Sequence, residues 1–304
     1  MIRQEFKILN PWFITGFSDG DGTFSLVIRI SKTYKIGYRV VPVYSVCAKN
    51  STENILLLKS IQNYFSGIGH IYSSGNISRF EVHKLEEHKI IRKHFEQYPL
   101  QSTKYIYFKL WCETLDIMNT KNHLIEEGFY KILAIKSVFP KGISTTLKTK
   151  FPNILPYTKP QFTSSIISLD PNWIAGFVQA DGNFDLSVIK SKNKLGQTCN
   201  PQFKISQHSR DLDLLNRIMT YFSIGKILKP NKNNVCVFYI AGLAKIVSIV
   251  IPFFKIYSLY GMKLLDFNDF VKGIEIMKIK GHLTEKGLTQ LKALTSNMNY
   301  GRNL

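Results

Sequence analysis

The strongest constraint on the fold of this chain is an internal duplication. Residues 10–28, NPWFITGFSDGDGTFSLVI, match residues 170–189, DPNWIAGFVQADGNFDLSVI. Further matches follow in the same order and at nearly the same spacing: 57–71 with 214–227, Lys104 and Phe108 with Lys263 and Phe267, and 123–128 with 282–287. Since each copy carries one complete set of these matches, the sequence predicts two pseudo-symmetric repeats.

The length agrees with a two-domain chain. The 304 residues suit two domains of about 150 residues each. Prolines concentrate between the copies, and proline both lacks a backbone donor and restricts its neighbours. We therefore predict an N-terminal repeat over 1–139, an extended linker over 140–168 and a C-terminal repeat over 169–304.

Each repeat has the same expected order of elements. Asn10 and Asp170 are N-cap residues, each followed by a proline suited to the first helical position. The segment TFSLVIRIS then alternates between apolar and polar residues, which is typical of a half-buried strand. The remaining pattern predicts a second strand, a helix, another hairpin and closing helices. The fold class is therefore α+β.

Composition narrows the class of partner. Lys and Arg number 40 against 21 acids, a net charge of +19, which favours a polyanionic partner. The alternatives are a ribosomal-type or a membrane-surface protein. The longest apolar stretch, 239–254, is too short to span a bilayer. The four cysteines form no CxxC pair and the histidines no HExxH motif, so a zinc site is not expected.

Small residues recur at a spacing of four in the first helix of each repeat. Gly16 and Gly20 correspond to Gly176 and Ala180, and small residues at this spacing let two helix backbones approach closely. We predict that the two helices pack on a pseudo-twofold axis. The helix ends then bring Asp21 and Asp181 side by side.

Two carboxylates at helix C-termini repel each other and face the negative ends of two helix dipoles. A divalent cation reverses this penalty, and Mg²⁺ favours one or two carboxylates supplemented by phosphate oxygens and water. A basic protein with such a pair is typical of metal-assisted phosphodiester hydrolysis.

The segments ITGFSDGDG (14–22) and IAGFVQADG (174–182) resemble the two signatures of LAGLIDADG homing endonucleases. The chain resembles the single-chain, two-repeat branch encoded in introns of fungal mitochondria. This resemblance implies αββαββα repeats whose two four-stranded antiparallel sheets form a saddle on DNA. It also implies that Asp21 and Asp181 bind Mg²⁺, with Gly20 and Ala180 at the same metal site. Mn²⁺ or Ca²⁺ can occupy such a site, Ca²⁺ without cleavage.

The signatures differ at one earlier position. Asp19 in the first repeat corresponds to Gln179 in the second, and the resemblance implies that this acid is not an essential metal ligand. We expect Asp19 to cap the helix end or to hydrogen-bond near it.

Three further residues are candidates for the catalytic site. By resemblance, Lys104 and Lys263 lie near the scissile phosphate, where a cation stabilises developing negative charge. The alternative is that they are ordinary phosphate-binding or solvated lysines. Gln207 matches a position that orients water in relatives, or it is a surface glutamine. Its counterpart is Ala48, so the two halves of the site are expected to be asymmetric.

Sequence readout is expected from the outward faces of the strands, because a β-ribbon fits the major groove. The alternative is a solvated sheet face. The candidate DNA-binding residues are Thr23, Ser25, Arg29, Arg39, Ser45, His70, Tyr72, Arg79 and Glu81 in the first repeat, and Asn183, Asp185, Ser187, Gln202, Lys204, Lys226 and Tyr239 in the second. Glu81 and Asp185 are expected to accept from cytosine or to orient a base-reading arginine.

The sequence thus predicts a monomeric, Mg²⁺-dependent, site-specific double-strand DNA endonuclease. The resemblance implies a long asymmetric target, cleavage across the minor groove and short 3′ overhangs. The N-terminus shows no transit pattern, so we expect synthesis inside the compartment of action, the mitochondrion by resemblance, or a cytosolic protein. The alternatives are an RNA maturase acting on its own intron RNA and a non-cleaving DNA-binding protein on the same scaffold.

Overall fold

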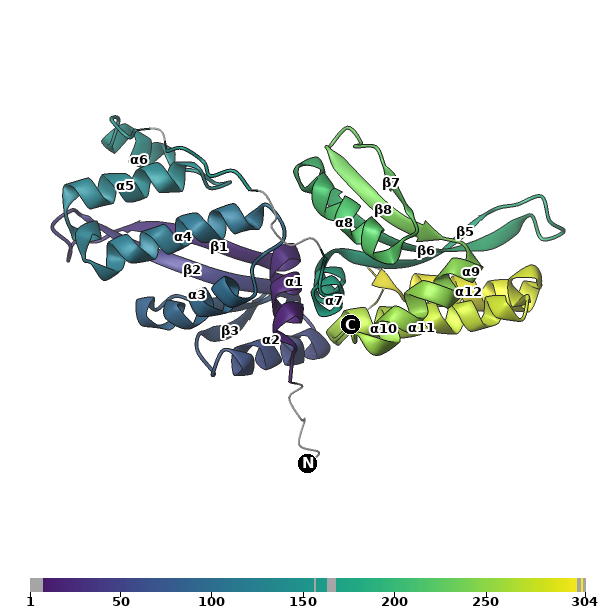
Figure 1. The fold of residues 1–304 in the computed structure, drawn as a ribbon. Helices are drawn as coiled ribbons and strands as arrows, with labels where there is room; N and C mark the ends of the chain where they lie inside the picture. The colour runs from purple at the N-terminus through teal and green to yellow at the C-terminus, as the bar shows by residue number, and fades with distance from the viewer. Residues whose placement is uncertain (1–7, 156, 163–167, 300–301, 303–304) are drawn as a thin grey trace, which may run out of the picture.

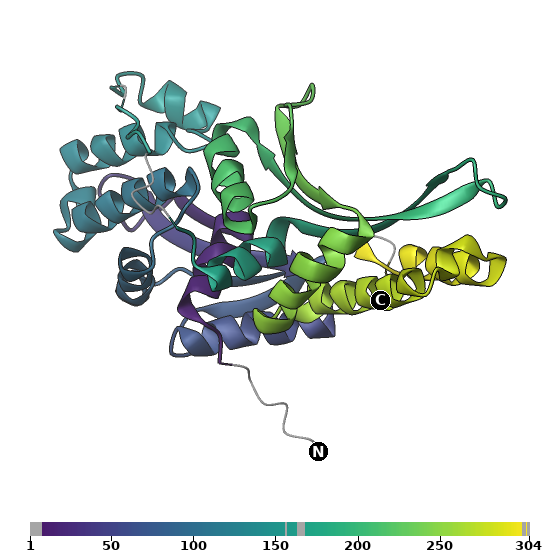
Figure 2. The same cartoon turned by 45° about the vertical axis from the view of Figure 1, so that its right-hand side comes forward.

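Two α+β repeats flank a central pair of helices in the computed structural model, which describes residues 8–155, 157–162, 168–299 and 302. The central helices are α1 (Pro11–Asp21) and α7 (Pro171–Asp181). Figure 1 shows them side by side, with one repeat on each side, and Figure 2 agrees. The duplication therefore predicted the architecture correctly.

The two repeats share one order of elements. The first contains α1, β1 (Gly22–Ile30), β2 (Tyr38–Lys49), α2 (Thr52–Tyr64), β3 (His70–Ser74), β4 (Ile77–Val82), α3 (His88–Gln97), α4 (Lys104–Asn119) and α5 (Glu126–Ser137). The second contains α7, β5 (Gly182–Lys190), β6 (Gln197–His208), α8 (Leu212–Phe222), β7 (Lys226–Leu228), β8 (Val235–Ala241), the helical run α9 (Leu243–Lys245) to α10 (Ile251–Ile256), α11 (Gly261–Lys278) and α12 (Glu285–Ser296). The αββαββα core is present, and further helices extend each copy.

The signature helices start and stop where the sequence predicts. The Asn10 side chain accepts from the Trp12 N–H at 2.9 Å, and Asp170 accepts from the Asn172 N–H at 2.7 Å. Each cap therefore satisfies an N–H that would otherwise lack a helical partner. Each helix runs directly into a strand at Gly22 or Gly182, so the aspartate that ends the helix has a fixed place beside the sheet.

Each repeat has its own antiparallel sheet and its own core. The strand orders are β1-β2-β4-β3 and β5-β6-β8-β7. Phe24 and Phe184 occupy equivalent buried positions, and each packs against aromatic rings of its own repeat. Because helices cover this face of each sheet, the opposite face remains for a partner (Figure 1).

The segment between the repeats differs from the prediction of an extended linker over 140–168. The helix α6 (Thr145–Lys150) forms within it, because Ser144 caps the Leu147 N–H and Leu147 is buried in the first core. The proline-rich part follows this helix. Positions 156 and 163–167 of the predicted linker lie outside the described residues. Among the described helices, none is long and apolar enough to cross a membrane.

A buried histidine joins α1 to α3 in the first repeat. The Thr15 hydroxyl donates to the Tyr98 carbonyl at 2.9 Å, so Thr15 accepts from His94 Nε2 at 3.1 Å. His94 Nδ1 then accepts from the Tyr64 hydroxyl at 2.9 Å. This arrangement holds the neutral imidazole, and burial lowers the pKa of His94 to about 3.

The His94 site predicts a loss of stability in acid. Its pKa rises from about 3 when folded to an ordinary 6.5 when unfolded, so the unfolded state binds the extra proton between these values. The free energy of unfolding should therefore fall as pH drops below 6.5, by roughly 1.4 kcal/mol per pH unit from this group. His94→Gln should flatten this dependence in urea unfolding at pH 7 and pH 5. Exposed His208→Gln is the control, and an unchanged slope in His94→Gln contradicts the assignment.

Candidate active site

The two signature helices are in backbone contact. A Cβ added to Gly16 would lie 2.0 Å from the Trp173 carbonyl oxygen, and one added to Gly176 would lie 2.0 Å from the Phe13 carbonyl oxygen. Further along, a Cβ at Gly20 would lie 2.2 Å from the Ala180 Cβ. The small residues are therefore required by this contact, as the sequence predicted.

Asp21 and Asp181 meet where the helix pair ends. A Cβ on Gly20 would lie 3.1 Å from Asp181 Oδ2, which places one carboxylate against the opposite helix. Burial and then the charge of Asp21 raise the pKa of Asp181 to about 6. Burial also raises the pKa of Asp21, while Lys104 and Lys263 lower it. The charged form of each acid therefore carries an energetic cost.

The two candidate lysines reach this place from α4 and α11. Lys104 Nζ donates to the Ser18 carbonyl at 3.3 Å and to the Gly20 carbonyl. Lys263 Nζ donates to the Gly182 carbonyl at 2.5 Å. Burial lowers the pKa of both lysines, and the nearby carboxylates oppose that shift. Neither is an ordinary solvated lysine, because each ammonium group bonds to a carbonyl at the end of a signature helix.

Gln207 adds an asymmetric contact. Its Nε2 donates to Asp181 Oδ2 at 2.5 Å. The strand register pairs Gly22 with Val46 and Gly182 with Ile205, so Ala48 stands in the first repeat where Gln207 stands in the second. The expected asymmetry is therefore present in the structure.

Asp19 lies in a closed hydrogen-bonding site beside the start of the Lys104 helix. It is 3% exposed and accepts from the Gln101 N–H at 2.8 Å, the Ser102 N–H at 3.1 Å and Ser102 Oγ at 2.5 Å. Across the helix pair, Trp173 Nε1 donates to it at 2.8 Å. The expectation that Asp19 hydrogen-bonds near the helix end is confirmed. No local sequence pattern predicts its partners outside α1, which are Gln101, Ser102 and Trp173.

The donors at the helix ends restrict which metal could bind. Among the described residues, no group of three or more His, Cys, Asp or Glu side chains is arranged to hold a metal. Asp21 and Asp181 are thus a two-carboxylate set that needs carbonyl, phosphate or water oxygens for completion. Such a set suits a hard cation like Mg²⁺ and does not suit zinc. The Gly20 carbonyl, one candidate ligand, is engaged by Lys104 here.

The candidate DNA-binding residues share the helix-free face of each sheet. One row crosses all four strands of the first sheet, from Thr23 through Ser45 and Glu81 to His70. In the second sheet, the equivalent row runs from Asn183 through Lys204 and Tyr239 to Lys226. The others occupy the same faces: Ser25, Arg29, Arg39, Tyr72 and Arg79 in the first sheet, and Asp185, Ser187 and Gln202 in the second.

Several details of this face differ from the sequence prediction. Ser45 is only 7% exposed, so its short side chain presents little surface to a partner. Asp185 accepts from Lys204 Nζ and from Ser187 Oγ, both at 2.6 Å, so its basic partner is a lysine. Glu81 pairs with His83 Nε2 at 2.8 Å. The expectation that these two acids accept from cytosine or orient a base-reading arginine stays a prediction.

The fold and site define a class. In each of the two pseudo-symmetric repeats, a helix ends in an aspartate beside a lysine, and a sheet presents a polar face. This is the arrangement of a single-chain, two-repeat nuclease scaffold. A model of the LAGLIDADG endonuclease family matches residues 14–115 and 174–274. The chain therefore belongs to the LAGLIDADG endonuclease family.

Individual relatives agree with this assignment. Probable intron-encoded endonuclease 3 of Neurospora crassa is 33% identical over 94% of this chain, and probable intron-encoded endonuclease 2 of the same fungus is 34% identical over 95%. The structure of the I-SmaMI LAGLIDADG homing endonuclease bound to cleaved DNA is 35% identical, with a TM-score of 0.92, and covers 98% of this chain and 100% of that one. The present chain spans 54% and 65% of the lengths of the two Neurospora proteins.

Proposed function

We propose that this protein is a sequence-specific, Mg²⁺-dependent double-strand DNA endonuclease of the homing type. The observation that carries the proposal is the meeting of Asp21 and Asp181 at the end of a backbone-contact helix pair. Two partly buried carboxylates that face each other repel, and a divalent cation relieves this repulsion. Membership of the endonuclease family and the structure of I-SmaMI with cleaved DNA support the same activity.

Each residue at the ends of the signature helices has a proposed role in cleavage. Asp21 and Asp181 would hold the metal, with the Gly20 and Ala180 carbonyls as further candidate donors. A bound divalent metal polarises phosphate oxygens and lowers the pKa of water. Lys104 and Lys263 place positive charge where a scissile phosphate would gain negative charge. Gln207, bonded to Asp181, is placed to orient a water molecule on one side only. I-SmaMI has also been solved with its uncleaved target in the presence of calcium ions, which supports a divalent-metal site here.

The sheet faces supply the proposed DNA contacts. Arg29 and Arg39 pair at the outer end of the first sheet, while Lys204 and Lys226 share a row of the second. With a net charge of +19, such a surface binds phosphates by counterion release, and its strands present side chains to the major groove. One chain holds both halves of the site, so we propose a monomer on a long asymmetric target. The names of the Neurospora relatives support an intron-encoded protein, and a mitochondrial protein of Saccharomyces cerevisiae that is 25% identical over 95% of this chain supports the mitochondrion as its compartment.

Selection from a randomised duplex library tests the proposal. The wild-type protein with Mg²⁺ should release one family of cleaved sequences, with short 3′ overhangs and different half-sites. The same preparation should bind the selected duplex more tightly than its own intron RNA. Binding of the intron RNA without cleavage of any duplex would contradict the nuclease function and favour the maturase alternative. Binding of one duplex without cleavage would favour the DNA-binding alternative.

A further inference from the structure

Each active-site lysine lies at the start of a long helix whose first amides are held from two sides. Lys104 is the first residue of α4, and Lys263 is the third residue of α11. The first N–H groups of a helix have no partner within the helix. The side chains that accept from these amides therefore fix where each helix begins and where its lysine lies.

The first helix start is held by both repeats. From the same repeat, Asp19 accepts from Ser102 Oγ, and Ser102 Oγ accepts from the Lys104 N–H at 3.2 Å. From the opposite repeat, Asp211 accepts from the Thr103 N–H at 2.8 Å and from Thr103 Oγ1 at 3.2 Å. Asp211 directly precedes α8, and its side chain is buried.

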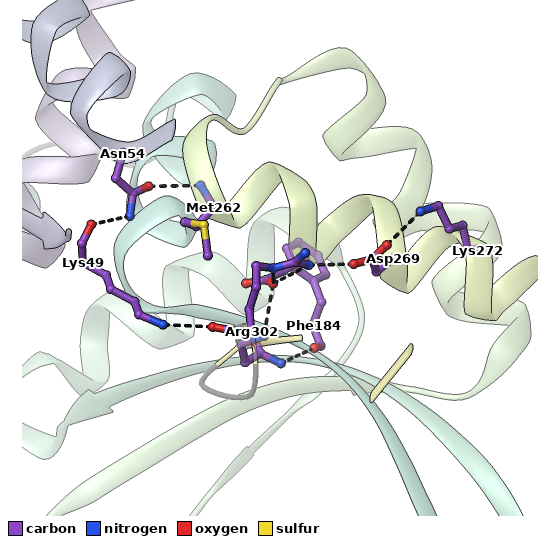
Figure 3. A network of polar contacts seen from close by, with 9 residues as sticks. Lys49, Asn54, Phe184, Met262, Asp269, Lys272 and Arg302 are labelled. Carbon is purple, nitrogen blue, oxygen red and sulfur yellow. Dashed lines mark hydrogen bonds and ion pairs between the residues drawn. The ribbon is translucent and has the colours of Figure 1, made fainter. Parts of the chain in front are cut away.

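The second helix start repeats this arrangement. From the same repeat, Gln179 Oε1 accepts from the Tyr260 N–H at 2.9 Å. From the opposite repeat, Asn54 Oδ1 accepts from the Met262 N–H at 3.0 Å. Figure 3 shows Asn54 reaching Met262 while its Nδ2 donates to the Lys49 carbonyl at 2.9 Å. A Cβ on Gly261 would lie 2.3 Å from Asn54 Oδ1, so this glycine admits the contact.

The four holding side chains are related by the duplication. Asp19 and Gln179 occupy the same place in the two signatures. Asn54 and Asp211 each stand three residues before the matching Leu-Leu of 57–58 and 214–215. The contacts are therefore reciprocal: each repeat supplies one buried acceptor to the lysine helix of the other.

This inference rests on the proposed function. We propose that Asn54 and Asp211 are positioning residues, each of which fixes the position of the active-site lysine in the opposite repeat. Each lysine helix then depends on a side chain of its own signature and on one from the partner repeat. Placement within fractions of an ångström matters at a reacting phosphate, where small misplacements cost large factors in rate. The position of each lysine is thereby coupled to the opposite repeat through the helix starts, in addition to the shared carboxylates.

Strand-resolved, single-turnover cleavage of the selected duplex tests this coupling. Lys104→Ala and Lys263→Ala first assign each lysine to the strand that it slows more. Asp211→Ala should then slow the Lys104 strand about tenfold more than the other strand, and Asn54→Ala should show the opposite bias. Asp211→Asn keeps an acceptor for Thr103 and should restore most of the rate. Asn216→Ala, at an exposed α8 position, is the matched control.

Amide hydrogen exchange gives a readout that needs no cleavage. Asp211→Ala should speed exchange at 101–104, in the other repeat, and Asn54→Ala should speed it at 260–263. Equal slowing of both strands, or exchange that changes only beside the substituted residue, would overturn the coupling. If the wild-type protein cuts no duplex while the two variants show the crossed exchange pattern, the proposed nuclease activity is removed and the positional coupling stays intact.

Discussion

Asp21→Asn and Asp181→Asn are each expected to abolish cleavage of both strands while leaving DNA binding intact. Each substitution removes one of the two charges that would hold the metal, and the amide keeps the size of the side chain. Loss of a metal-held phosphate is worth several kcal/mol, or about a thousandfold in rate or more. Binding should be unchanged or slightly tighter, because a negative charge facing phosphates is removed. A mobility-shift titration measures this binding.

The matched control for these variants is Asp116→Asn, which neutralises an exposed carboxylate that pairs with Arg92 on the first-repeat helices. It should bind and cut like the wild type. If Asp21→Asn loses DNA binding and cleavage together, the carboxylate acts in folding or docking, and its assignment to the metal is wrong.

Gly16→Ala is expected to break the contact between the repeats. The new Cβ would lie 2.0 Å from the Trp173 carbonyl oxygen and 2.8 Å from the Phe177 nitrogen. These are backbone atoms inside the opposite helix, so no side chain can rotate to make room. Separation of α1 and α7 should cost about 3 kcal/mol or more of unfolding free energy, measured by urea denaturation.

Gly37→Ala controls for the loss of a glycine. Gly37 has a φ of +75° and no atom within 4 Å of an added Cβ. Its replacement should therefore cost only the strain of a left-handed backbone, about 1–2 kcal/mol. A Gly16→Ala protein as stable as Gly37→Ala would contradict a backbone-contact helix pair.

Much of the site could be predicted because its signals are local and duplicated. Asn10 and Asp170 mark the helix starts, the glycines mark the contact face, and the acids stand where each helix ends. The pairing of Asp21 with Asp181 follows from symmetry once these signals are recognised in both copies. The α6 helix within the predicted linker was missed because its short polar sequence has weak periodicity.

The contacts that hold the site together could not be predicted in this way. Trp173 reaches Asp19, Asp211 reaches Thr103 and Asn54 reaches Met262 across large sequence separations. Each is a single polar contact between two elements that are far apart in the sequence. Their relative position is set only when the interface packs. A weak signal did exist: Asn54 and Asp211 are hydrogen-bond acceptors at matching positions, Asn54 in the first turn of α2 and Asp211 directly before α8.

Cleavage of the selected duplex by the wild type, Asp21→Asn and Asp181→Asn, with Mg²⁺ and with a chelator, is the most direct test of the central claim. The account predicts that the wild type cuts both strands only with Mg²⁺ and that neither variant cuts either strand while both bind the duplex. Normal cutting by either variant with Mg²⁺, or cutting by the wild type in chelator, would contradict a metal site built from the two signature aspartates.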